Sequence, residues 1–182
     1  MIDVRSDTVT RPTPGMLEAM MHADVGDDVF GEDETVNELQ RTAAERFGME
    51  AALFCPSGTM TNQIAVKVHT QPGDEVICDE LSHVYLYEGG GIAFNSGCST
   101  RLMKGHRGRF TARDVLDNVN RSDDSHFPHT RLVAIENTVN KGGGCCWELG
   151  EIEQIRKACD ARGLALHLDG ARIFNALVAR SE

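Results

Sequence analysis

The chain has no apolar run long enough to span a membrane and no cluster of lysine and arginine side chains. A membrane-spanning helix needs about 20 mostly apolar residues, and nucleic acids and anionic membranes select for basic clusters. The formal net charge is −10. The N-terminus also lacks the basic-then-apolar pattern of a secretory leader. The sequence therefore predicts a protein that binds neither nucleic acid nor membranes.

Metal-binding and nucleotide-binding motifs are missing too. The six cysteines lack CxxC or Cys–His spacing, so we expect no metal site. Scattered thiols in a chain of 182 residues indicate a reducing compartment, and we expect a cytoplasmic protein. The phosphate-binding motifs GxxxxGK[ST] and GxGxxG are also absent.

Short apolar segments alternate with amphipathic ones along the chain. The apolar segments predict strands at 51–55, 74–78, 99–103, 132–135 and 164–168. The amphipathic ones predict helices from Pro14 and at 34–47, 59–68, 83–91, 111–119, 148–161 and 171–178. This alternation predicts an α/β fold with a mostly parallel sheet sandwiched by helices.

The domain organisation follows from the same pattern. We expect residues 1–50 to form an N-terminal arm with helices, and residues 51–182 to form a large α/β domain. Because the last helix would ordinarily lead to another strand, we expect this sheet to be incomplete within the chain.

Asp169 stands at the carboxyl tip of the last predicted strand, where α/β sheets bind ligands. A buried acid there needs a partner. Arg172 could be that partner in an ion pair. Alternatively, Asp169 could keep the ring nitrogen of pyridoxal phosphate protonated, while Arg172 grips a carboxylate.

Two further segments follow predicted strands. Ser57, Gly58 and Thr59 form a small-residue turn at a helix N-terminus, which is either an anion site or a capped turn without a ligand. His83 begins the next helix and could stack on a flat ring, move a proton, or simply cap the helix. The neighbouring acids Asp79 and Glu80 are expected to be solvated.

Taken together, several motifs resemble the low-specificity L-threonine aldolases, which belong to the β-eliminating lyase group of fold-type I pyridoxal phosphate enzymes. The motifs are Ser6–Thr13, Gly26–Asp33, Pro56–Met60, Asp79–His83, Glu136–Thr138 and His167–Arg172. They run through the chain in order and at family spacing.

The resemblance implies a pyridoxal 5′-phosphate site. Gly58 and Thr59 would bind the cofactor phosphate, His83 would stack on the pyridine ring, and Asp169 would pair with the ring nitrogen. Arg172 would complete the cofactor site.

The implied substrate is a small amino acid, L-threonine or L-allo-threonine, cleaved to glycine and acetaldehyde. Arg172 and Ser6 would hold its carboxylate, and His83 is a possible base for its hydroxyl proton. Family members are homo-oligomers, usually tetramers built as dimers of dimers, and we expect the stretch Asp27–Gly31 to serve at a subunit interface.

The sequence departs from the family pattern at two places. The family often carries a histidine where Val139 stands, at a position that contacts the substrate hydroxyl. None of the four lysines matches the family's cofactor-binding lysine; they are Lys67, Lys104, Lys141 and Lys157. We therefore interpret the chain as the N-terminal portion of such an enzyme, without the C-terminal small domain, and expect little turnover from it alone. A β-eliminating lyase for another amino acid and an inactive fragment are the alternatives.

Overall fold

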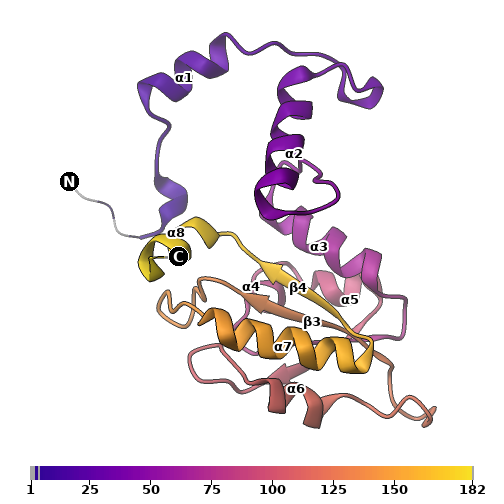
Figure 1. The fold of residues 1–182 in the computed structure, drawn as a ribbon. Coiled ribbons are helices and arrows are strands. Elements are labelled where there is room, and N and C mark those ends of the chain that lie inside the picture. The colour runs from indigo at the N-terminus through magenta and orange to yellow at the C-terminus, as the bar shows by residue number, and fades with distance from the viewer. Residues whose placement is uncertain (1–2, 4, 182) are drawn as a thin grey trace. The chain divides into compact units, whose positions relative to one another are not determined.

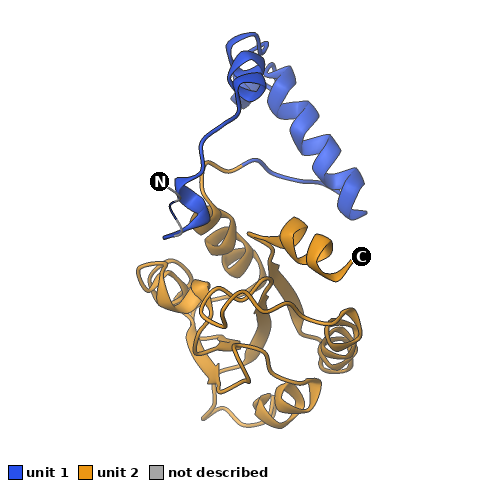
Figure 2. Cartoon of the chain, turned by 90° about the vertical axis from the view of Figure 1, so that its left-hand side faces the viewer, with its two compact units in different colours: residues 1–54 blue, residues 55–182 orange. Residues whose placement is uncertain are grey.

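The computed structural model describes residue 3 and residues 5–181, and divides into two units. Unit 1 comprises residues 1–54 and unit 2 comprises residues 55–182 (Figure 2). Each unit is described by itself below. None of the described helices is long and apolar enough to cross a membrane.

Unit 1 contains two α-helices and two short 3-10 helices. These are η1 (Asp7–Val9), α1 (Pro14–Met21), η2 (Asp28–Phe30) and α2 (Glu34–Phe47). Thr13 and Asp33 cap the two α-helices, and Gly48 ends α2 in a left-handed conformation with φ +61°. None of the described residues of unit 1 is buried, and the methionines of α1 are exposed.

Unit 2 is built around four parallel strands, as the sequence predicts for a parallel α/β fold. The strands are β1 (Glu75–Asp79), β2 (Ser99–Met103), β3 (Thr130–Glu136) and β4 (Ala165–Asp169). They lie in the order β2-β1-β3-β4, with Ile77 opposite Val133 and Glu136 opposite Asp169. The carboxyl ends of β1, β3 and β4 therefore meet at one edge of the sheet.

Helices cover both faces of this sheet (Figure 1). The helices of unit 2 are α3 (Gly58–His69), α4 (His83–Leu86), α5 (Gly91–Ser96), α6 (Ala112–Asn118), α7 (Leu149–Arg162) and α8 (Ile173–Arg180). Successive strand residues alternate between two buried clusters: Val133 packs with α6 and α7, and Leu132 packs with α3 and α5. Burial on both sides explains why the central strands β1 and β3 are largely apolar.

Two predicted elements differ from the structure. The strand predicted at 51–55 is absent; this segment is irregular, and the Phe54 N–H donates to Gln40 Oε1 at 2.9 Å. An apolar run becomes a strand only when a neighbouring strand pairs with it. The single helix predicted at 83–91 is instead α4, a turn, and the start of α5, because Gly89 and Gly90 adopt positive φ.

Candidate functional site

Asp169 ends β4 at the carboxyl edge of the sheet. Its Oδ2 accepts a hydrogen bond from Asn62 Nδ2 at 2.9 Å, and its Oδ1 accepts one from the Ala171 N–H at 3.1 Å. Asn62 lies near the start of α3, so this hydrogen bond connects that end of the helix to Asp169, although no strand precedes α3. Arg172 lies half-buried at the N-terminus of α8.

His83 begins α4, just beyond β1. Its Nδ1 lies 3.0 Å from Glu88 Oε1, and its backbone N–H donates to Glu136 Oε2 at 3.0 Å. The His83 side chain is 37% exposed, whereas that of Glu88 is fully buried. Side-chain ligand atoms of His83, Glu88 and Asp169 all lie within 4.8 Å of one another. The structure thus brings together His83 and Asp169, the two residues predicted to contact a cofactor ring.

The N-terminus of α3 provides hydrogen-bond donors. The Ser57 hydroxyl accepts a hydrogen bond from the Met60 N–H at 3.2 Å and so caps the helix. Gly58 and Thr59, the first two helical residues, are exposed. The first N–H groups of a helix have no partner within the helix and favour anions. A Cβ added to Gly58 would meet no atom within 4 Å, so the space beside it is open.

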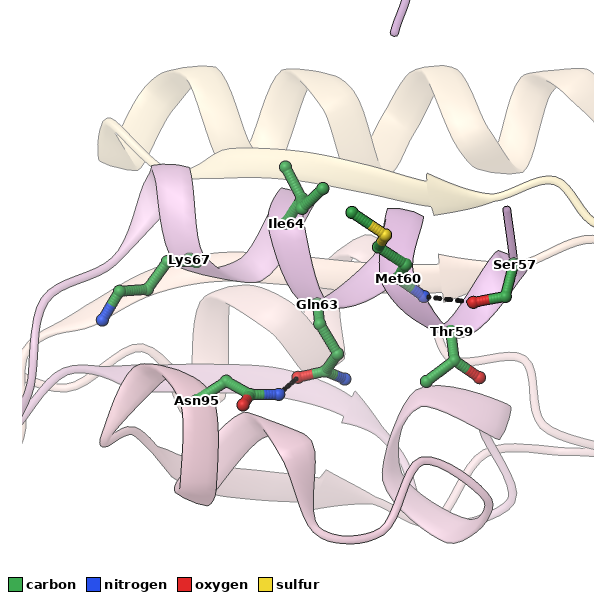
Figure 3. A pocket seen from close by; sticks show the side chains of 7 residues that line it. All are labelled: Ser57, Thr59, Met60, Gln63, Ile64, Lys67 and Asn95. Carbon is green, nitrogen blue, oxygen red and sulfur yellow. Dashed lines mark hydrogen bonds between the residues drawn. The ribbon is translucent and has the colours of Figure 1, made fainter. Parts of the chain in front are cut away.

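A pocket of about 440 Å³ extends along α3 from Ser57 to Lys67 (Figure 3). Met60, Ile64 and Asn95 also line it. It shares Ser57 and Thr59 with the α3 N-terminus. Neither His83 nor Asp169 lines it, so this pocket is separate from the position expected for a ring between those two side chains.

Four polar residues at this edge received no role from the sequence: Asn62, Glu88, Glu136 and His167. Burial raises the pKa of Glu136, whose two oxygens accept the N–H groups of His83 and Asn140. Burial lowers the pKa of His167, whose Nε2 lies 2.8 Å from Asn62 Oδ1. No local signal in the sequence pointed to Asn62, because its contact with Asp169 spans 107 positions.

Three further residues that the sequence singled out lie outside this group. Asp79 is buried, not solvated, because its carboxylate accepts the N–H groups of Leu81 and Gly105. Val139 is 1% exposed and packs in the core beside α6 and α7. The Lys141 ammonium lies 5.4 Å from the centre of the Tyr87 ring.

Ser6 belongs to unit 1. Its hydroxyl caps η1 by accepting a hydrogen bond from the Thr8 N–H at 3.2 Å. Asp27 similarly caps η2 through the Val29 N–H. The predicted roles of Ser6 at the substrate and of Asp27–Gly31 at an interface stay predictions.

A parallel sheet with polar side chains and a helix N-terminus at its carboxyl edge is the arrangement in which α/β domains bind small anionic ligands. The sequence model of the β-eliminating lyases matches residues 3–182. The chain therefore belongs to the β-eliminating lyase family, whose members are pyridoxal phosphate enzymes.

Individual relatives are similar over nearly the whole chain. A low specificity L-threonine aldolase of Escherichia coli is 45% identical over 179 residues, covering 98% of this chain and 53% of the relative. A probable low-specificity L-threonine aldolase 2 of Arabidopsis thaliana is 44% identical, covering 98% and 51%. The chain thus spans about half the length of these relatives.

Solved structures show the same fold. The threonine aldolase of Leishmania major superposes with a TM-score of 0.76 at 29% identity, covering 89% of this chain and 46% of that protein. This likeness confirms the α/β fold class predicted from the sequence.

Proposed function

We propose that this chain is the cofactor-binding part of a pyridoxal phosphate-dependent aldolase that cleaves L-threonine and L-allo-threonine to glycine and acetaldehyde. The observation that carries the proposal is Asp169 at the tip of β4, oriented by Asn62 at the same sheet edge as His83. The names of the relatives support the reaction.

The described residues fit the cofactor by their chemistry. The N–H groups of Gly58 and Thr59 suit a phosphate, and the open space beside Gly58 lets it approach. The partly exposed ring of His83 can lie against a flat heterocycle, and the Asp169 carboxylate suits a protonated ring nitrogen. When bound, the protonated ring of the cofactor accepts the electron pair released as the Cα–Cβ bond of the substrate breaks.

The chain's own residues would do the remaining work. Asp169 holds the proton on the ring nitrogen. Arg172 binds the substrate carboxylate, for which a guanidinium offers a bidentate grip. His83 takes the proton of the β-hydroxyl, which must leave as the aldehyde forms.

We also propose that the protein is a homo-oligomer, a dimer of dimers located in the cytoplasm. The support is unit 1, where Met16, Met20 and Met21 of α1 are 58%, 68% and 81% exposed. A second copy of the chain could cover this apolar surface. In this proposal, Asp27–Gly31 lies at the interface between subunits.

Binding of pyridoxine 5′-phosphate to this chain, measured by calorimetry, tests the cofactor site. This probe lacks the aldehyde, so it cannot react with surface lysines such as Lys67. We expect Asp169→Asn to weaken binding by about 10- to 100-fold, as loss of a charge-assisted hydrogen bond predicts. The control Asp117→Asn, on α6, should bind as tightly as the wild type. Equal affinity in all three proteins would contradict the proposed site.

The products separate the aldolase from the alternative elimination activity. A protein that contains this chain and is loaded with cofactor should release glycine and acetaldehyde from L-threonine. A β-elimination on another amino acid would release ammonia and a keto acid. Since none of the four lysines matches the family's cofactor lysine, we expect turnover by the 182-residue chain to fall far below the usual ~1–10³ s⁻¹.

A further inference from the structure

Glu88 is a fully buried acid that none of the roles above uses. Its side chain is 0% exposed. Its Oε1 accepts a hydrogen bond from Asn62 Nδ2 at 2.7 Å, and its Oε2 accepts one from Gln63 Nε2 at 2.6 Å. His83 Nδ1 lies 3.0 Å from Oε1. A buried carboxylate is stable only with such partners.

The neighbours of the two amides fix which of their atoms face Glu88. Gln63 Oε1 accepts a hydrogen bond from Asn95 at 3.2 Å (Figure 3), so Gln63 Nε2 points to Glu88. Asn62 Oδ1 lies 2.8 Å from His167 Nε2, so Asn62 Nδ2 donates to both Glu88 and Asp169. Amide nitrogens only donate. Both oxygens of Glu88 therefore act as acceptors.

The acceptor role of Glu88 also fixes the direction of its third hydrogen bond, the one with His83. An ionised carboxylate has no hydrogen to donate, so the hydrogen between His83 and Glu88 is on Nδ1, and a neutral imidazole carries only this one N–H. The lone pair is then on Nε2. The packing keeps Glu88 in place: a Cβ on Gly91 would lie 2.3 Å from the Gln63 side chain, so α5 rests directly against this amide.

We propose that Glu88 is a positioning residue that holds His83 in the Nδ1–H tautomer, so that Nε2 can accept the β-hydroxyl proton. Asn62 donates to both Glu88 and Asp169. One hydrogen-bond network therefore holds the proposed base, His83, and the proposed partner of the ring nitrogen, Asp169. This inference rests on the proposed function. An aspartate orients the histidine of serine proteases in the same way, and its amide replacement leaves the wrong tautomer.

Nitrogen-15 NMR of the imidazole groups in the cofactor-free chain tests the proposal without substrate. In the wild type, we expect His83 to show a protonated Nδ1 and an unprotonated Nε2. In Glu88→Gln, the Nε2–H form should become the main one. The control Glu80→Gln removes a nearby acid outside the network and should leave the wild-type tautomer. A wild-type His83 with its hydrogen on Nε2 would overturn the proposal, even if Glu88→Gln does not fold.

Kinetics of a longer protein that contains this chain and is loaded with cofactor give a second readout. We expect Glu88→Gln to lower kcat for threonine cleavage by ~10²-fold or more, as for loss of an oriented general base, with little change in KM. Glu80→Gln should keep both constants. A higher KM with an unchanged kcat would contradict the positioning role. Failure of the chain to bind pyridoxine 5′-phosphate would instead overturn the proposed function.

Discussion

One half-buried side chain, His167, contributes to how the stability of this protein depends on pH. Burial lowers the pKa of His167 below its ordinary value of 6.5, and His69 lowers it further, while Asp169 and Glu88 act in the opposite direction. Its Nε2–H is needed as a donor to Asn62. At neutral pH, the lowered pKa of His167 favours its neutral imidazole form.

This neutral histidine predicts a loss of stability in acid. Below pH 6.5 the unfolded chain binds a proton that folded His167 resists, so the free energy of unfolding should fall between pH 7 and pH 5.5. His167→Gln keeps an N–H donor but cannot titrate, so its fall should be smaller in urea unfolding. His126→Gln, at an exposed position, should keep the wild-type fall. An identical pH dependence in His167→Gln and wild type would refute this expectation.

Val139 is one of the two places at which we expect the sequence to depart from the family pattern. Its side chain packs with Phe110 and Trp147, and a Cβ on Gly108 would lie 2.4 Å from Val139 Cγ1. There is no space for a larger ring. We expect Val139→His to lower the free energy of unfolding by about 1–3 kcal/mol, through overpacking and a buried polar group. Val178→His, at a position 81% exposed, should change it by less than about 0.5 kcal/mol. Equal stability of the two variants would contradict the buried placement of Val139.

At the scale of elements, α3 depends on its cap. Ser57 Oγ accepts the Met60 N–H, one of the donors that has no partner within the helix. Ser57→Ala should therefore lower the free energy of unfolding by about 1 kcal/mol, and Ser57→Gly by only a few tenths. Chemical denaturation of both variants measures the difference. If alanine and glycine were equally harmless, the hydroxyl would not be the cap.

Local signals in the sequence predicted those elements whose ends are marked by capping residues next to them. The helix at 34–47 has its predicted bounds, because Asp33 caps its start and Gly48 its end. The strand predicted at 51–55 was wrong, because pairing with another strand is a long-range requirement that an apolar run does not reveal. The turn between α4 and α5 depends on Gly89 and Gly90 at positive φ, and three consecutive glycines show only that a break occurs there.

The candidate site was predictable in part, for the same reason. Asp169 and His83 stand at strand ends, which the alternation of segments indicates. Asn62 contacts Asp169 across 107 positions and Glu88 across 26. Such contacts depend on how α3 and α5 pack on the sheet. No local pattern in the sequence reports them, so Glu88 and Asn62 become visible only in the fold.

At the scale of the whole molecule, the sheet explains how one domain gathers these groups. Four parallel strands, of which the central β1 and β3 are buried, place their carboxyl ends side by side, and α3 supplies its N-terminus to the same edge. Every strand has the same direction, so the polar residues after β1, β3 and β4 converge without long loops. The match to the β-eliminating lyases over residues 3–182 agrees with this arrangement.

A crystal structure of the chain with pyridoxal 5′-phosphate bound tests the central claim most directly. We expect the phosphate to accept hydrogen bonds from the N–H groups of Gly58 and Thr59, and the ring nitrogen to lie against the Asp169 carboxylate. The ring of His83 should lie on one face of the heterocycle. A phosphate bound elsewhere, or an Asp169 carboxylate turned toward solvent, would contradict the claim.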